Sequence, residues 1–193
     1  MSAMEERVRE LFAESAKTRA EFFTPEAAAM TAKMADAILG CLKKGGKLLI
    51  CGNGGSASDS AHFAGEMTGR FMKERPAISA VALNTDMASI TAIANDYGYE
   101  KVFSRQIEGL ARPEDALFVL STSGNSANLL EAVKKAKEKK LKTFGLLGRD
   151  GGKLKGMLDL SLTAPAGSSP RIQEIHITVI HVLCDLIESG LQP

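Results

Sequence analysis

The stretch Lys47-Leu-Leu-Ile-Cys51-Gly-Asn-Gly-Gly-Ser-Ala57 decides the fold, because an apolar run passes directly into a glycine loop. The residues from Ser56 to about Met72 have helical spacing, so the expected order is buried strand, loop and helix. At such a junction free backbone N–H groups and the helix dipole favour an anion, and glycines let a ligand come close. A tight turn at the end of a strand is the alternative explanation for an isolated glycine cluster.

The same loop also satisfies a loose dinucleotide-binding pattern, Gly52-x-Gly54-x-x-Ala57. In that class of site an acidic residue ends a second strand about 20 residues further on and binds the ribose. No acidic residue stands at that place in this sequence. We therefore discount a dinucleotide.

Outward from this loop, apolar runs and helical segments alternate along the chain. Strands are expected at 77–83, 116–120, 143–147 and 158–163, and helices at 86–94, 126–140 and 171–188. Two further helices precede the first strand: an amphipathic one over about 5–23, and one that begins after the N-cap Thr24 and stops at Gly45-Gly46. This order predicts an α/β fold with a parallel sheet flanked by helices on both faces.

Composition narrows the class of protein. The 193 residues are 45% hydrophobic, which suits one buried core, so residues 1–193 are expected to form a single domain. With 24 basic and 23 acidic residues, the net charge of +1 gives no reason to expect nucleic acid or a membrane surface as a partner. Three widely spaced cysteines, a charged amino terminus and no long apolar stretch indicate a reducing compartment and a cytoplasmic protein.

A second loop, Ser121-Thr-Ser-Gly-Asn-Ser126, also follows an apolar strand and opens a helix. Its four hydroxyl groups and its backbone donors suit a phosphomonoester. It lacks the lysine of a nucleoside-triphosphate loop, so it is suited to holding a phosphate and not to transferring one. Ser126 as a plain N-cap is an equally good explanation of this loop alone. Together, the two loops favour a sugar-phosphate cleft.

Two helices carry side chains that could do acid–base or metal chemistry. His62 and Glu66 are four residues apart and share one helix face above the first loop. On the closing helix, Gln173 and His181 are about 12 Å apart along the axis, so they share a small ligand only if they lean together or come from different copies. These four residues would make a plausible site for a divalent metal. His176 is more readily explained as a surface or packing residue.

Several segments, in this order, resemble the phosphoheptose isomerases of the sugar isomerase (SIS) fold. They are Cys51–Ser56, His62-Phe-Ala-Gly-Glu66, Thr68-Gly-Arg70, Ala94-Asn-Asp96, Ser121–Ser126 and Arg171-Ile-Gln-Glu-Ile-His176. The resemblance runs over nearly the whole chain. It implies a three-layer SIS-type fold, a homotetramer with active sites at subunit interfaces, and a cytoplasmic enzyme that converts sedoheptulose 7-phosphate to D-glycero-D-manno-heptose 7-phosphate. That reaction would be the first step toward the heptose of lipopolysaccharide or other surface glycans.

The resemblance also implies roles for particular residues of this chain. One zinc ion per subunit would be held by His62, Glu66, Gln173 and His181. Substrate contacts map to Asn53, Gly54, Gly55, Ser56, Glu66, Asn95, Asp96, Ser121, Thr122, Ser123, Ser126 and Gln173. Pro170 stands where some family members have an acidic residue, so any supporting role of that carboxylate is missing here.

A sister group resembles the sequence almost as well in Ala82-Leu-Asn-Thr-Asp86, Thr91–Asp96 and Leu183-Cys-Asp-Leu-Ile187. These proteins bind the bacterial replication initiator and tend to lose the catalytic residues. Glu66 and His181 are retained here, which favours the enzyme over a non-enzymatic adaptor. A sugar-phosphate sensing module is a third hypothesis.

An aldose–ketose isomerase must move a proton between two carbons through an enediol while oxygen protons exchange. Glu66 is the expected base for the carbon-bound proton, and His181 the acid/base for the oxygen protons or for ring opening. A metal could polarise the carbonyl, but coordination would make Glu66 a weaker base.

Overall fold

The computed structural model describes residues 2–191 and is α/β throughout. Within that range five parallel strands form one sheet in the order β2-β1-β3-β4-β5. The strands are β1 (Leu48–Gly52), β2 (Ala80–Ala82), β3 (Ala116–Ser121), β4 (Lys142–Gly148) and β5 (Leu160–Ala164). The helices are α1 (Ala3–Phe22), α2 (Pro25–Leu42), α3 (Gly55–Thr68), α4 (Met87–Tyr97), η1 (Tyr99–Lys101), α5 (Val102–Leu110), α6 (Ala127–Glu138), α7 (Gly152–Lys155) and α8 (Ser169–Gly190). The predicted parallel sheet between helices is confirmed.

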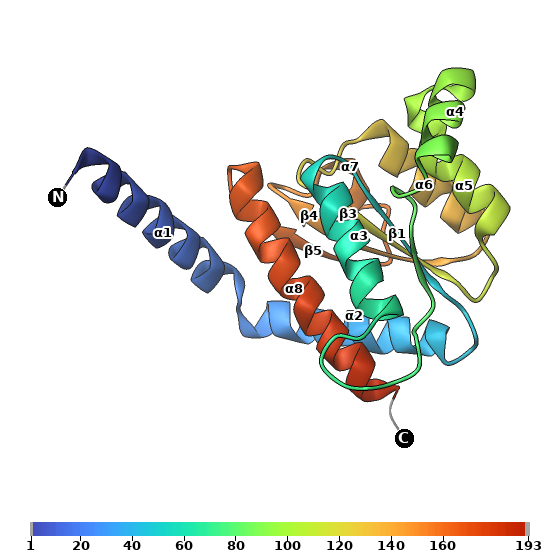
Figure 1. Cartoon of the computed structure of the whole chain (residues 1–193), viewed down its shortest axis with the longest axis horizontal. Coiled ribbons are helices and arrows are strands. Elements are labelled where there is room, and N and C mark those ends of the chain that lie inside the picture. Colours follow the sequence, from blue (N-terminus) through green and yellow to red (C-terminus); the bar gives the residue numbers. More distant parts are fainter. Residues whose placement is uncertain (1, 192–193) are drawn as a thin grey trace.

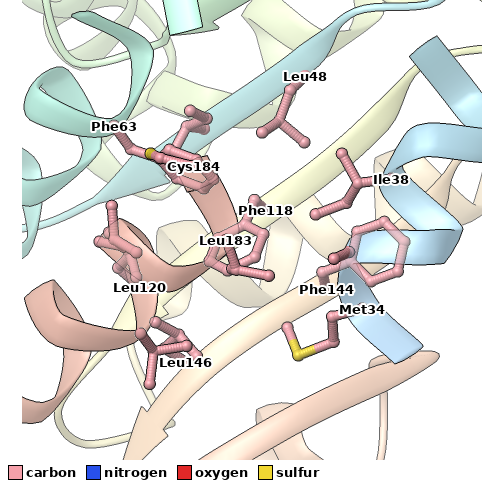
Figure 2. Packing of buried hydrophobic residues seen from close by; sticks show 14 of the residues in the cluster. Met34, Ile38, Leu48, Phe63, Phe118, Leu120, Phe144, Leu146, Leu183 and Cys184 are labelled. Carbon is pink, nitrogen blue, oxygen red and sulfur yellow. The ribbon is translucent and has the colours of Figure 1, made fainter. Parts of the chain in front are cut away.

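Both faces of the sheet are covered, as the unbroken apolar strands require. Alternate side chains of each strand point to opposite faces, so Phe118 packs toward α2, α3 and α8 while Val119 packs toward α5 and α6. Figure 2 shows the first of these cores, where Phe118 and Phe144 of the strands meet Met34 of α2 and Leu183 of α8. The three helices of this face include the two that carry the predicted acid–base residues.

The element boundaries differ from the sequence predictions in a few places. The helix predicted to continue to about Met72 ends at Thr68, because the following segment turns away at Gly69 and is held by hydrogen bonds to Glu188. The strand predicted over 77–83 is only three residues long. The elements η1, α5 and α7 were not predicted from the sequence, although α5 buries Val102, Phe103 and Ile107.

The first helix lies apart from the rest of the chain. In Figure 1, α1 extends away from the sheet and its flanking helices, and the only residue that it buries is Phe22. It is tied to the start of α8, where Ser15 Oγ donates to Glu174 and Arg171 donates to the Leu11 carbonyl. The apolar face predicted for this helix is exposed: Phe12 is 71% and Val8 43% accessible.

The order of the strands in the sheet indicates where a ligand would bind. The chain leaves β1 toward β2 on one side and returns to β3 on the other, so the direction of winding changes between β1 and β3. Ligands of open parallel sheets bind at this point, beyond the carboxyl ends of the strands. The two loops there are the glycine loop after β1 and the serine loop after β3, both singled out from the sequence.

His176 lies in the core and not at the surface. It is 1% accessible, its Nε2–H donates to the Leu147 carbonyl, and its Nδ1 has no partner in the described part of the chain. Burial lowers the pKa of this imidazole to about 4, and the hydrogen bond to Leu147 opposes that shift only partly. The packing alternative for His176 is therefore confirmed.

Because the pKa of His176 is lowered by folding, we expect the protein to lose stability in mild acid. The unfolded chain binds the proton near pH 6.5 and the folded chain only near pH 4, so the stabilisation is complete above about 6.5 and is lost as the pH falls. We expect a loss of about 3 kcal/mol between these values. Urea unfolding at several pH values should show this slope, and His176→Gln, which keeps the donor to Leu147, should remove it. Equal slopes in both proteins would contradict the prediction.

Candidate active site

The two loops enclose a small cavity of about 40 Å³. Its lining consists of Leu120 and six polar residues, two from the glycine loop and four from the serine loop: Asn53, Ser56, Ser121, Thr122, Ser123 and Ser126. The cavity faces the amino ends of α3 and α6, whose dipoles favour negative charge. All six are among the predicted substrate contacts.

Two hydroxyl groups of residues that line this cavity accept backbone N–H groups within the serine loop. Ser121 Oγ accepts the Gly124 N–H, and Ser123 Oγ accepts the Asn125 N–H, so each hydroxyl proton is left for another acceptor. Ser126 occupies the N-cap position of α6, but its side chain makes no capping hydrogen bond. This weakens the N-cap explanation of Ser126 and favours an anion as the partner of its hydroxyl.

A pair of side-chain amides joins the glycine loop to the first turn of α6. Asn53 and Asn128 exchange two hydrogen bonds of 2.9 and 2.8 Å, and the Tyr99 hydroxyl donates to Asn53 Oδ1. Asn128 and Tyr99 were not singled out from the sequence. The position of Asn128, two residues after Ser126 in the first turn of α6, was the available signal.

The predicted acid–base residues meet between α3 and α8, which lie side by side in Figure 1. His62 Nε2 lies 3.1 Å from His181 Nε2 and 3.2 Å from Glu66 Oε1. The Phe71 ring stacks on the His181 ring with centroids 5.7 Å apart. The Glu66 side chain is 24% accessible, so this carboxylate is open to a ligand yet held on the helix.

The distances between these donor atoms can be compared with the geometry that the predicted metal requires. Between residues 2 and 191 no group of three or more His, Cys, Asp or Glu side chains converges into a ready-made metal site. However, the two separations that meet at His62 Nε2 are close to the value of about 3.3 Å between neighbouring ligand atoms in a tetrahedral zinc site. Two pairs of donor atoms, His62 with His181 and His62 with Glu66, thus have the spacing of zinc ligands, and a zinc ion at this place stays a prediction.

The fourth predicted ligand, Gln173, lies at a different place. A Cβ added to Gly55 would overlap the Gln173 side-chain amide, so this amide rests on the glycine loop. Ser169, four residues earlier, donates to the Thr122 hydroxyl. Thus α8 contacts the serine loop first, then the glycine loop, and finally His62. In the described residues no hydrogen bond joins Gln173 to the two histidines or to Glu66, and its role as a ligand stays a prediction.

Asn95 and Asp96 lie on the exposed side of α4, where Asn95 Nδ2 donates to Asp96 Oδ1. No hydrogen bond within residues 2–191 joins either of them to the two loops. Their predicted contact with substrate stays a prediction. Pro170 lies in the first turn of α8, a position that suits proline because its missing N–H would have no partner there.

Asp59 is a further carboxylate near the site and is not among the residues predicted from the sequence. It lies on α3 three residues before His62, and its Oδ2 has no partner in the described residues. Burial raises the pKa of this carboxyl, and the nearby His62 lowers it by less. The spacing of three residues from His62 was the signal that could have found it.

A cavity of about 630 Å³ lies next to the amino-terminal ends of β1 and β2 and contains none of the predicted site residues. The candidate site is therefore the smaller cavity between the two loops, together with the side chains beside it. The two loops provide hydroxyl and backbone donors for a phosphate, and the cluster between α3 and α8 provides a carboxylate and two imidazoles for proton transfer.

Known proteins resemble this chain over most of its length. A model of the SIS domain family matches residues 11–148. The phosphoheptose isomerase of Helicobacter pylori strain 26695 is 58% identical over 147 residues, covering 76% of this chain and 77% of that protein. The phosphoheptose isomerase of Neisseria gonorrhoeae strain NCCP11945 is 52% identical over 196 residues, covering 99% and 98%. A solved phosphoheptose isomerase from Francisella tularensis superposes with a TM-score of 0.91 at 36% identity, covering 98% and 100%.

Proposed function

The chain belongs to the phosphoheptose isomerases of the SIS domain family, and we propose that it converts sedoheptulose 7-phosphate to D-glycero-D-manno-heptose 7-phosphate. The observation that carries this proposal is the meeting of Glu66, His62 and His181 beside two phosphate-suited loops. The similar proteins are named as isomerases, which supports an enzyme and gives no support to the adaptor alternative.

In this proposal Glu66 takes the carbon-bound proton and returns it to the neighbouring carbon. Its carboxylate is held on α3 and remains partly open, as a base that must reach substrate requires. His181 moves the oxygen protons, and the Phe71 ring stacked on it fixes the plane of its imidazole. The serine loop binds the phosphate at the far end of the sugar, and this positions the reacting carbons beside the Glu66 carboxylate.

We propose zinc, one ion per subunit, as the metal of this site. His62, Glu66 and His181 would hold it, and Gln173 would have to move from the glycine loop to join them. Bound there, the ion would polarise the carbonyl or hold the diol oxygens.

The test is to incubate the purified protein with sedoheptulose 7-phosphate and follow the products by NMR. We expect an aldoheptose phosphate, and we expect deuterium from heavy water at the carbon whose proton is moved. Failure to form the aldose with or without added zinc would reject the isomerase proposal. Product that forms equally well with Glu66→Gln would keep the isomerase but reject its base.

We expect Ser123→Ala to raise KM for the sugar phosphate about tenfold and to change kcat much less. The hydroxyl donates to the phosphate in the ground and transition states alike, so its loss weakens both equally. Steady-state kinetics will measure this, with Ser58→Ala on the exposed side of α3 as the control. An unchanged KM in Ser123→Ala would count against the phosphate site.

The chain is also proposed to form a homotetramer with active sites at subunit interfaces, in the cytoplasm. The exposed apolar face of α1 supports assembly, because a helix that buries so little in its own chain needs a partner for stability. The exposed Asn95 and Asp96 could then reach the site of a neighbouring subunit. No helix within residues 2–191 is long and apolar enough to cross a membrane, and the three thiols are buried and free.

Phe12→Asp should reduce the assembled mass from four times 20.5 kDa toward smaller species, since it puts a charge on the apolar face of α1. Light scattering at several concentrations will measure this. Lys17→Glu changes the charge elsewhere on the same helix and should leave the mass unaltered. A wild-type mass of 20.5 kDa at all concentrations would reject the tetramer.

A further inference from the structure

One arginine side chain binds the backbone carbonyl groups at the C-terminal end of α3, the helix that carries Glu66. The last carbonyl groups of a helix have no partner within it. At the end of α3, Arg75 Nη2 donates to the Glu66 carbonyl at 2.8 Å, and Nη1 donates to the Met67 carbonyl at 2.9 Å. A cation at this end also interacts favourably with the helix dipole. Arg75 therefore fixes the turn of backbone from which the Glu66 side chain projects.

Arg75 is itself held by a buried carboxylate on α8. Its Nε donates to Glu188 Oε1 at 3.0 Å, and the two side chains are 4% and 0% accessible. Glu188 also accepts the backbone N–H groups of Phe71, Met72 and Lys73. Burial alone would raise the pKa of Glu188, but these donors and Arg75 together lower it, so the carboxylate stays charged.

The same carboxylate is linked to His181, the second acid–base residue, through Phe71. Glu188 holds the Phe71 backbone at 3.2 Å, and the Phe71 ring stacks on His181. His181 lies seven residues before Glu188, two turns earlier on the same face of α8. Two contacts therefore join α3 to α8. The first is the pair His62 and His181 at the site, and the second is the pair Arg75 and Glu188, about 10 Å further along the axis of α8.

We propose that Arg75 and Glu188 are positioning residues for the isomerase, which set Glu66 through its backbone and His181 through Phe71. This inference rests on the function proposed above, because it assigns no chemistry to the pair itself. Neither side chain is open to substrate. Their effect is on the alignment of two groups that must act on neighbouring atoms, and a displacement of about 1 Å can cost roughly 100-fold in rate.

Two single variants test the pair. Arg75→Lys keeps a positive charge near Glu188 but has one nitrogen in place of the three that reach Glu188, Glu66 and Met67. Glu188→Gln keeps the shape and loses the charge. We expect each to lower kcat by about 10- to 100-fold. We also expect KM to stay within about threefold, because the phosphate loops are untouched.

Asp115→Asn is the matched control. Asp115 is also a buried carboxylate, 2% accessible, and it accepts from Lys47 Nζ at 2.5 Å and from the backbone N–H groups of Lys47 and Arg112. These contacts lie outside α3 and α8. Asp115→Asn and Glu188→Gln should therefore both lower the Tm, but only Asp115→Asn should leave kcat of the folded enzyme at the wild-type value. Measurements at a temperature well below each Tm separate turnover from folding.

The double variant Arg75→Met with Glu188→Gln covers the case in which a single variant does not fold, since it leaves no unpaired buried charge. A folded double variant with reduced kcat and nearly unchanged KM supports the inference. Wild-type kcat in any folded variant of the pair, or an equal fall of kcat in Asp115→Asn, overturns it. If the wild-type enzyme forms no aldose, the proposed function fails first; if it does and the variants match it, only this inference fails.

Discussion

Glu66→Gln is expected to lower kcat by roughly 10²–10⁴-fold, the usual share of general-base catalysis. Glutamine keeps the shape and the helix propensity of this position on α3 but removes the basic carboxylate. Substrate should still bind, because the cavity between the loops contains no atom of Glu66. Steady-state kinetics together with exchange of substrate protons into heavy water will measure the effect.

Two other roles of Glu66 predict different results. A helix carboxylate with no part in the reaction contributes only a few tenths of a kcal/mol, so Gln would leave turnover nearly intact. If Glu66 is only a metal ligand, saturating zinc should restore much of the lost activity. Near-wild-type kcat and exchange would remove Glu66 from the mechanism and leave His181 as the candidate base.

Gly124→Ala is expected to cost several kcal/mol of stability and to abolish tight binding of the sugar phosphate. Gly124 has φ of 66°, in the left-handed region, and a Cβ there would overlap the backbone carbonyl of Gly151. Because both obstacles are backbone, the serine loop must move to relieve them. Thermal unfolding and KM of the variant will show the two effects.

Gly40→Ala is the control for this substitution. Gly40 lies inside α2 without a positive φ, and a Cβ there would meet nothing within 4 Å. Alanine should therefore raise the stability by about 0.5–1 kcal/mol. Equal stability of Gly124→Ala and wild type would mean that the serine loop is far more pliable than its contacts indicate.

Local patterns in the sequence were enough to predict the sheet, its flanking helices and both phosphate-suited loops. Apolar runs such as Leu48–Cys51 and the loops that follow them are encoded by adjacent residues, so periodicity and glycine placement predict them. The bounds of β2 and the presence of α5 were harder to predict from the sequence. With three residues, β2 is too short for a periodic signal, and α5 is separated from α4 only by a short 3₁₀ turn.

Within the site, helical spacing put His62 and Glu66 on one face, and the family resemblance joined Gln173 and His181 to them. His181 does lie beside His62, whereas the Gln173 amide lies against Gly55 of the glycine loop. The sequence did not predict Arg75 or Glu188. They are 113 residues apart, and before folding each looks like an ordinary surface charge. Only the packing of α8 against α3 brings them together, and no local spacing carries that information.

The change of winding direction between β1 and β3 has a consequence for how activity appears during folding. The two strands are about 68 residues apart in the chain, as the contact between Lys47 and Asp115 shows, so their pairing closes a long loop. Non-local parallel pairing is slow compared with helix formation. The two halves of the phosphate cavity therefore come together late, and a chain cut before residue 116 can form helices but no cavity. Recovery of catalysis should lag behind recovery of helical circular dichroism when the denatured protein is returned to buffer.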